Sequence, residues 1–534
     1  MTESLQRQIG RMCIVGFEGH TAPDYLLDWL RAGRVGGIIL FARNIESVAQ
    51  VIALTDSLRA ASPDDLIIAI DQEGGAVARM RSAQGFSEVP GAMALASAAD
   101  GARHAEVVYA VLGAELRAVG IDWDYAPCVD LAYNPANASL GTRSFGRDAA
   151  HVGALAAGAV RGLQASPHRV AACGKHFPGL GDTDIDTHLA LPTVTTSLDD
   201  LRGVDLQPYR GIVDAGVMSV MVTHTIFAAL DPDLPATLSP VVVSQLLRGE
   251  LDYDGAVCTD CMEMKAIADH FGAGESAVLA ALAGHDAILF SHTPAMQAAA
   301  HDALLAAAQS GRLSSHVIAS ANRRLVALRA FAVRPRGDAA VVNSSQHART
   351  ALEAARAGVS VIPTGARVHV FEALNDDTAP LDIAAMQAAQ ARVGVIEFPS
   401  RLDSGIVEAG GVTGFARAIA ARLLGTRVRV WRGGASADSE ASALARSSDP
   451  LIIATRSAHL DPVITAQVRA LIATAPGRVI VVALRNPYDA ALFADDLKVS
   501  AVLCTSGDAE PSLIAAAEAL AGDYVPSGTL PVMI

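Results

Sequence analysis

Eight short apolar runs in the first part of the chain constrain its fold more than any other feature. They occupy residues 13–19, 35–41, 66–71, 121–127, 170–176, 217–224, 255–260 and 287–291. Segments with helical spacing, such as residues 46–61, separate most of these runs. Buried strands that alternate with helices indicate a parallel sheet. Eight such units over roughly 330 residues suit a (β/α)8 barrel with insertions.

Polar residues stand where several of these runs end. They are Asp71, Lys175, His176, His224 and Asp260. In a barrel of this kind the active site is built at the carboxyl ends of the strands. A doubly wound sheet can also contain eight strands, but it would not need polar residues at so many strand ends. We therefore predict an α/β protein whose N-terminal part is a TIM-like barrel.

A second set of apolar runs follows a polar stretch at residues 334–347 that contains proline and glycine, as linkers do. These runs occupy residues 368–373, 393–398, 428–433, 451–456, 479–484 and 501–506. Helical segments separate them too, which predicts an open sheet covered by helices on both faces. The predicted division is a catalytic barrel at 1–335, a linker at 336–346 and a C-terminal α/β sandwich domain at 347–534.

Charge and composition exclude several classes of partner. The net charge of −15 argues against nucleic acid and against an anionic membrane surface, because both require a basic footprint. No apolar run approaches the roughly 18 residues that span a bilayer, and the first residues lack the pattern of a secretory signal. The six cysteines are scattered, mostly in apolar runs, as buried cytosolic thiols are. We expect a cytoplasmic enzyme.

Residues 173–194 concentrate three aspartates, two histidines and a lysine in a loop rich in glycine and proline. Asp186 lies two residues before His188, so its carboxylate can fix one imidazole nitrogen. The other nitrogen is then able to move protons near neutral pH. Asp260 ends the seventh run, where a fixed carboxylate is a plausible nucleophile. These residues together predict a nucleophile and a separate acid/base.

Five long motifs carry a family resemblance, in the family's order. They are "AIDQEGGAVAR", "NPANASLGTRSFGRD", "KHFPGLGDTDIDTHLALP", "VMVTHTIFAALDPDLPATLSP" and "YDGAVCTDCMEMKAIADHFG". The chain resembles family-three glycoside hydrolases, in the branch of bacterial β-N-acetylglucosaminidases. "ALRNPYDA" and the closing "PSGTLPVMI" resemble the usual second domain of that family. The resemblance covers nearly the whole chain.

The resemblance implies a retaining, two-step mechanism. Asp260 would attack the anomeric carbon and form a glycosyl-enzyme. His188, oriented by Asp186, would protonate the leaving oxygen and later deprotonate the acceptor. Most retaining glycosidases use a second carboxylate for this role. By the same resemblance the non-reducing sugar would be held by Asp71, Arg143, Lys175 and His176, and His224 would line the same pocket. We expect no cofactor and no metal.

Structural interpretations of the same residues stay open. Asp71 can pair with Arg79, and Arg143 and Lys175 can belong to structural ion pairs. Two further carboxylates, Glu73 and Glu263, are expected to support the site or to begin helices. Cys258 and Cys261 flank the predicted nucleophile, and we interpret them as packing thiols. The chain departs from the family at Leu180, where a histidine is usual, and this departure can alter how the loop packs.

The sequence therefore predicts a retaining exo-β-N-acetylglucosaminidase that acts on oligosaccharides ending in β-linked GlcNAc. Muropeptide fragments and chitin-type oligosaccharides are the expected substrates. The alternatives are a β-N-acetylglucosaminide phosphorylase, which uses phosphate as acceptor, and a β-glucosidase or β-xylosidase of the same family. An inactive sugar-binding protein is a further alternative, against which the intact catalytic residues argue. The sequence leaves open the aglycone, the oligomeric state and the role of the second domain.

Overall fold

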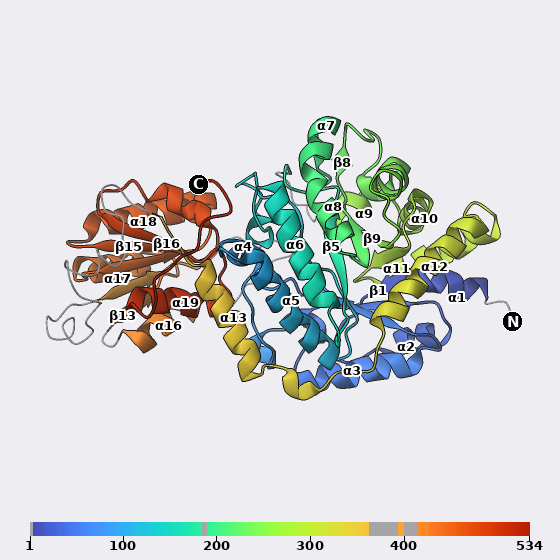
Figure 1. The fold of residues 1–534 in the computed structure, drawn as a ribbon, viewed down its shortest axis with the longest axis horizontal. Coiled ribbons are helices and arrows are strands. Elements are labelled where there is room, and N and C mark those ends of the chain that lie inside the picture. Colours follow the sequence, from blue (N-terminus) through green and yellow to red (C-terminus); the bar gives the residue numbers. More distant parts are fainter. Residues whose placement is uncertain (1–3, 184–189, 363–392, 400–413, 424–425) are drawn as a thin grey trace.

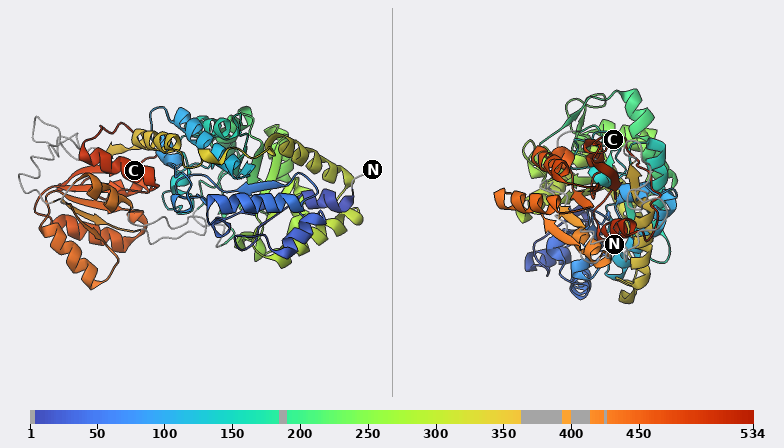
Figure 2. Two further views of the ribbon diagram at one scale, coloured as in Figure 1. Left: turned by 90° about the horizontal axis from the view of Figure 1, so that it is seen from below. Right: turned by 90° about the vertical axis from the view of Figure 1, so that its left-hand side faces the viewer.

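The structure is a computed structural model that describes residues 4–183, 190–362, 393–399, 414–423 and 426–534. Figure 1 shows two units side by side: an N-terminal unit coloured blue to yellow-green and a C-terminal unit coloured orange to red. The two views of Figure 2 show that the units follow one another along the long axis of the molecule.

The N-terminal unit is a closed barrel of eight strands, in the order β1-β10-β9-β7-β5-β4-β3-β2. All of its strand pairs are parallel. Each predicted run contains one strand, so the predicted barrel is confirmed. The strands are β1 (Cys13–Val15), β2 (Gly37–Leu40), β3 (Ile67–Ile70), β4 (Trp123–Asp124), β5 (Ala171–Phe177), β7 (Ser219–Val222), β9 (Ala256–Cys261) and β10 (Ala287–Phe290).

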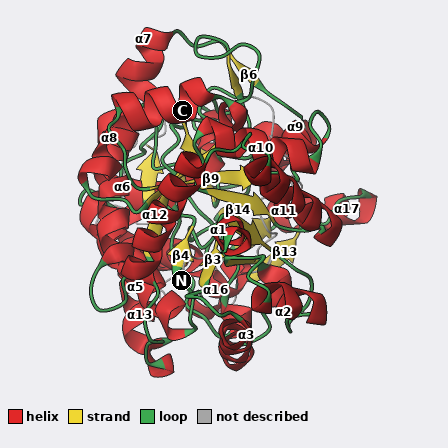
Figure 3. Ribbon diagram, turned by 90° about the vertical axis from the view of Figure 1, so that its right-hand side faces the viewer, coloured by secondary structure: helices red, strands yellow, loops and turns green. Residues whose placement is uncertain are grey.

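Helices surround the barrel, and Figure 3 shows the strands inside this ring of helices. Alternate residues of a strand face opposite sides, so Ile67 and Ala69 pack in one hydrophobic cluster while Ile68 and Ile70 pack in the other. The larger helices are α2 (Asp24–Arg31), α3 (Val48–Ala61), α5 (Gly101–Ala118), α6 (Ala149–Gln164), α8 (Gln207–Asp214), η6 (Val241–Glu250), α10 (Ala273–Ala283), α11 (Pro294–Gln309) and α12 (Ser315–Ala332).

Shorter elements complete the N-terminal unit. Two of the short helices start with a serine cap: the Ser4 side chain accepts from the backbone N–H of Arg7 at α1, and the Ser197 side chain accepts from that of Asp200 at α7. A two-stranded sheet of β6 (Thr193–Val194) and β8 (Ile226–Phe227) lies above the barrel strands. The short helices are α1 (Leu5–Arg11), α4 (Ala92–Ala96), α7 (Leu198–Asp200), η4 (Leu201–Asp205) and α9 (Lys265–Ala268), with 3-10 turns at η1 (Ala42–Asn44), η2 (Ser82–Gln84), η3 (Gly141–Arg143) and η5 (Ala236–Leu238).

The C-terminal unit contains a six-stranded sheet in the order β11-β16-β15-β14-β12-β13. Strand β11 runs antiparallel to β16 and the other pairs are parallel. The strands are β11 (Ser360–Ile362), β12 (Gly394–Glu397), β13 (Arg427–Val430), β14 (Leu451–Thr455), β15 (Val479–Ala483) and β16 (Val499–Cys504). The predicted run at 368–373 lies outside the described residues, and β11 was not among the predicted runs.

Helices cover both faces of this sheet, as predicted. One apolar cluster joins the sheet to α13 (Ser345–Gly358), α16 (Gly414–Arg422) and α19 (Glu510–Ala521). The other joins it to α17 (Ala435–Arg446) and α18 (Pro462–Thr474). Two 3-10 turns, η8 (Ala458–Leu460) and η9 (Pro487–Leu492), follow the carboxyl ends of β14 and β15.

Helix α13 belongs to the cores of both units. Ala351 and Ala354 pack in the barrel cluster, whereas Ala355 packs in the cluster of the C-terminal sheet. The predicted linker at 336–346 contains the 3-10 turn η7 (Ala339–Val341) and the first residues of α13. In the part of the chain that the structure describes, no helix is both long enough and apolar enough to cross a membrane.

Candidate active site

A cavity of about 550 Å³ is lined by residues from the carboxyl ends of the barrel strands. Five of the predicted site residues line it: Asp71, Arg143, Lys175, His176 and Asp260. Asp71 and Arg143 follow β3 and β4, Lys175 and His176 lie near the end of β5, and Asp260 lies near the end of β9. Separate strands therefore bring the five residues together. The predicted acid/base pair, Asp186 and His188, lies outside the described residues.

The predicted sugar-binding residues form a buried network of ion pairs. Lys175 Nζ lies 2.7 Å from Asp71 Oδ1 and 2.7 Å from Glu73 Oε1. Arg143 donates two hydrogen bonds to Glu73, at 3.0 and 2.8 Å. Arg79 Nη2 lies 3.6 Å from Asp71 Oδ2. These residues therefore pair with one another, and Asp71, Arg143 and Lys175 also line the cavity.

The network holds Glu73 and Lys175 in their charged forms. Burial on its own raises the pKa of Glu73, but Arg143 and Lys175 outweigh this and hold the pKa well below its usual range. Burial likewise lowers the pKa of Lys175, and Asp71 and Glu73 more than compensate, so that its pKa lies above the ordinary value. Charged donors and acceptors that are buried in the wall of the cavity make strong hydrogen bonds to hydroxyl groups.

Asp130 supports this site, and the sequence analysis did not find it. Its Oδ2 lies 2.7 Å from His176 Nδ1, and its carboxylate also accepts from the backbone N–H groups of His176 and Leu180. Arg143 Nη2 lies 3.3 Å from His176 Nε2. The network thus assigns a proton to Nδ1 and orients the ring. Burial raises the pKa of Asp130, but His176 and these hydrogen bonds bring it below its ordinary value.

Leu180, where the chain departs from the family, contacts Asp130. Its backbone N–H donates to Asp130 Oδ1 at 2.8 Å, and its side chain is buried. An apolar side chain therefore packs inside the base of the loop, where the family usually has a histidine.

Asp260 lies at the end of β9 and is partly exposed to the cavity. Its Oδ1 accepts from the backbone N–H of Cys261 at 2.7 Å. Of the flanking thiols, Cys258 Sγ lies 3.8 Å from Cys173 Sγ, and Cys261 Sγ lies 2.8 Å from Ser291 Oγ. Burial raises the pKa of the Cys261 thiol to about 12, so it is protonated at neutral pH. Both thiols pack in the barrel core.

One group among the described residues has the spacing of metal ligands: Cys128, Asp130 and His176. Its ligand atoms already satisfy one another, since Asp130 Oδ2 lies 3.3 Å from Cys128 Sγ and 2.7 Å from His176 Nδ1. Burial raises the pKa of Cys128 well above its usual value, whereas a metal requires the thiolate. The three residues therefore suit a hydrogen-bonded cluster better than a metal site.

His224 lies behind the cavity wall and is fully buried. Its Nδ1 lies 2.7 Å from Thr237 Oγ1 and its Nε2 lies 2.9 Å from the carbonyl oxygen of Cys261. It is not among the residues that line the cavity. The structure therefore connects His224 with the strand that carries Asp260.

Comparisons with known proteins agree with this geometry. Residues 4–328 match the model of the glycosyl hydrolase family 3 N-terminal domain. A β-hexosaminidase of Stenotrophomonas maltophilia strain R551-3 is 34% identical over 342 residues, which cover 58% of this chain and 99% of that one. One from Pseudomonas aeruginosa strain LESB58 is 40% identical over 273 residues, covering 51% and 79%.

A solved structure resembles the whole chain. It is that of a glycoside hydrolase family 3 β-N-acetylglucosaminidase from Paenibacillus sp. strain FPU-7, which is 33% identical and superposes with a TM-score of 0.89. The match covers 100% of this chain and 99% of that one. The family model alone spans more than half of the sequence. This chain therefore belongs to glycosyl hydrolase family 3 and is a glycoside hydrolase.

Proposed function

We propose that the chain is a retaining exo-β-N-acetylglucosaminidase that removes terminal β-linked GlcNAc from oligosaccharides. One observation carries this proposal: Asp71, Arg143 and Lys175 of a buried charged network line the same cavity as Asp260. The network, made by Asp71, Glu73, Arg143 and Lys175, supplies fixed donors and acceptors for sugar hydroxyls. The names of the similar proteins, β-hexosaminidase and β-N-acetylglucosaminidase, support GlcNAc as the sugar.

In the proposed mechanism the Asp260 carboxylate forms a bond to the anomeric carbon while the bond from that carbon to the leaving oxygen breaks. His188, oriented by Asp186, donates the proton that the leaving oxygen takes up. Water then attacks the glycosyl-enzyme, gives a proton back to His188 and releases Asp260. The network holds the hydroxyls throughout, and because its members are already paired they need little rearrangement in the transition state.

The first experiment measures release of p-nitrophenol from its β-N-acetylglucosaminide, with and without phosphate. Asp260→Asn should lower kcat by about a thousandfold or more, because the amide cannot act as the nucleophile. Asp269→Asn, at an exposed aspartate beyond the same strand, is the matched control and should keep full activity.

The products separate the alternatives. Free GlcNAc in the presence of phosphate supports a hydrolase, and GlcNAc-1-phosphate would identify a phosphorylase. Faster turnover of the β-glucoside or β-xyloside would contradict the assigned sugar. Full activity of Asp260→Asn would contradict the mechanism.

We also propose muropeptide fragments or chitin-type oligosaccharides as natural substrates and the cytoplasm as the location. Both stay predictions. Hydrolysis of purified fragments of each kind, compared by kcat/KM, tests the first. Fractionation of cells followed by immunodetection of the chain tests the second.

A further inference from the structure

We propose that the C-terminal domain positions the sugar-binding wall of the active site through residues 132–147, here called the bridging segment. The inference rests on the proposed function, because it concerns the residues assigned there to the sugar. Among the described residues, those that line the cavity all come from the barrel unit. For the described residues of the C-terminal domain, the proposed role is therefore one of positioning.

The bridging segment carries Arg143 in its 3-10 turn η3, and it begins two residues after Asp130. The backbone N–H of Ala132 donates to the carbonyl of Gly146 at 2.8 Å, so the two ends of the segment are joined. Ser144 Oγ donates to the carbonyl of Asp130 at 2.6 Å. Movement of this closed loop would therefore displace both Arg143 and Asp130, the hydrogen-bond partner of His176.

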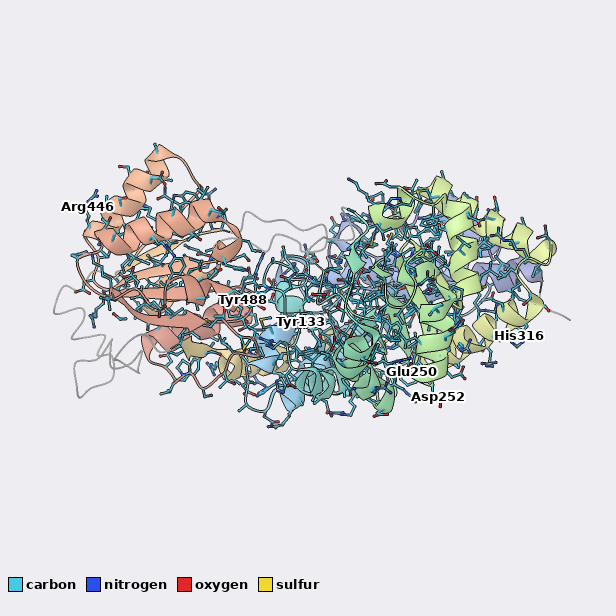
Figure 4. All side chains as sticks on the ribbon, turned by 90° about the horizontal axis from the view of Figure 1, so that it is seen from above. Tyr133, Glu250, Asp252, His316, Arg446 and Tyr488 are labelled. Carbon is cyan, nitrogen blue, oxygen red and sulfur yellow. The ribbon has the colours of Figure 1, made fainter. Side chains whose placement is uncertain are left out.

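The C-terminal domain contacts the first residue of the bridging segment. Tyr488, in η9, donates a hydrogen bond from its hydroxyl to the carbonyl of Ala132 at 3.4 Å. Its ring packs with Met93, Ala132 and Val532 in a small buried cluster that is separate from the main cores. Figure 4 labels Tyr488 at the edge of the C-terminal unit, next to Tyr133 on the barrel side of the junction.

Two glycines let the C-terminal domain come close to the remainder of the segment. Gly146 has a φ of +136°, and a Cβ there would lie 2.7 Å from the carbonyl oxygen of Pro531. The next backbone N–H, of Arg147, donates to that same carbonyl at 3.2 Å. Gly141, the first residue of η3, would place a Cβ 3.2 Å from Asn486 Oδ1. Asn486 is itself buried and held by a bond from its Nδ2 to Ser457 Oγ at 2.8 Å.

Asn134 and Asn137 of the bridging segment donate hydrogen bonds to residues 180–183, which follow β5. Asn137 Nδ2 donates to the carbonyl of Leu180 and to Thr183 Oγ1, both at 3.1 Å. Asn134 Nδ2 donates to the carbonyl of Thr183 at 3.2 Å. The segment thus lies between the C-terminal domain and residues 180–183. Within that range the backbone N–H of Leu180 donates to Asp130. Contacts through one closed loop connect Tyr488 with both Arg143 and Asp130.

The test replaces Tyr488 in the full chain and measures both backbone exchange and kinetics. Tyr488→Ala should speed hydrogen–deuterium exchange in peptides from 132–147. It should lower kcat/KM for the β-N-acetylglucosaminide about tenfold or more and raise the inhibition constant of GlcNAc, because a displacement of about 1 Å in a positioning group can cost up to a hundredfold. Tyr488→Phe keeps the packed ring and removes only the hydroxyl. Its kcat/KM should lie within about threefold of the wild-type value.

Gly434→Ala is the control in the same domain. That glycine has a φ of +91° and no atom within 4 Å of an added Cβ, so the substitution strains the C-terminal domain away from the junction. It should leave exchange in 132–147 and kcat/KM unchanged. A loss of activity equal to that of Tyr488→Ala would mean that general destabilisation suffices, and it would overturn the proposal.

Unchanged exchange in 132–147, together with kcat/KM within twofold of wild type, would also overturn the proposal. If Tyr488→Ala does not fold, Asn486→Ala makes the same test at Gly141, with the same expected direction. If the wild-type chain does not act on the β-N-acetylglucosaminide, the proposed function fails. The exchange measurement then still decides the structural connection, so the two failures are distinguishable.

Discussion

At the scale of single residues, Glu73 is the centre of the proposed sugar-binding wall. One buried carboxylate pairs with both Arg143 and Lys175. Without it Arg143 would lose this partner and Lys175 would keep Asp71 alone. Breaking a buried pair of this kind costs about 3–5 kcal/mol. The supporting role expected for Glu73 therefore takes a specific form: it fixes the two cations in the geometry in which they face the cavity.

Asp205 is the residue at which we expect a pH effect on stability. Its carboxylate accepts a hydrogen bond from Tyr133 at 2.5 Å and is 7% exposed. Burial raises its pKa from 3.8 to about 6, and the nearby charges of Asp130 and Asp182 act in the same direction. Because the folded state holds this proton more tightly than the unfolded chain does, the contribution to stability is present below about pH 4 and is lost as the pH rises through about 6.

Asp205→Asn should remove this dependence. The variant should match wild type near pH 4 and exceed its free energy of unfolding at pH 8 by about 2–3 kcal/mol, the order that a shift of this size implies. Urea unfolding at a series of pH values measures the difference. Asp199→Asn, at an exposed aspartate in the preceding helix α7, is the control. Parallel profiles for wild type and Asp205→Asn would contradict the prediction.

At the scale of secondary-structure elements, Glu263 connects the loop after β9 with the start of α11. Its carboxylate accepts from the backbone N–H groups of His292 and Thr293 at 2.7–3.1 Å. Thr293 is the N-cap of α11 and makes no side-chain cap of its own. Glu263 thus accepts from the two N–H groups that directly precede the helix, and its negative charge lies near the positive end of the helix dipole.

Glu263→Gln should lower the free energy of unfolding by about 1 kcal/mol, because a neutral amide oxygen accepts more weakly than a carboxylate at a helix start. Chemical denaturation measures this. Glu440→Gln, at an exposed glutamate in α17, is the matched control and should change stability by less than about 0.5 kcal/mol. Equal stabilities of the two variants would show that the hydrogen bonds to Glu263 do not stabilise the helix start. Since Glu263 also lines the cavity, activity is not the readout here.

Elements differ in how far the sequence could predict them. All eight barrel strands were predictable because a buried parallel strand is a short apolar run, whatever its neighbours are. The strand ends likewise located four cavity residues, Asp71, Lys175, His176 and Asp260, whereas Arg143 was expected only from the family resemblance. The roles of Asp130 and His224 were not predictable, since both depend on partners 46 and 37 residues away in the chain. The role of the bridging segment was not predictable either, because its two glycines are needed only where Pro531 and Asn486 approach them.

At the scale of the whole molecule, helix α13 determines how the two units are joined. Its alanines enter both cores, and Gly358 at its end lies directly against the backbone of α4. An added Cβ at Gly358 would lie 2.1 Å from the carbonyl oxygen of Ala94. No side chain fits there unless the helix shifts, so the packing of the two units depends on this glycine.

Gly358→Ala should therefore separate the unfolding of the two units. Overpacking of this kind costs about 1–3 kcal/mol, and it acts on the contact that both cores share. We expect calorimetry to show the wild-type chain unfolding in one transition and the variant in two. Gly203→Ala is the control, because that exposed glycine has no atom within 4 Å of an added Cβ. It should stabilise the chain by up to about 1 kcal/mol. A single, unshifted transition in Gly358→Ala would mean that α13 does not hold the units together.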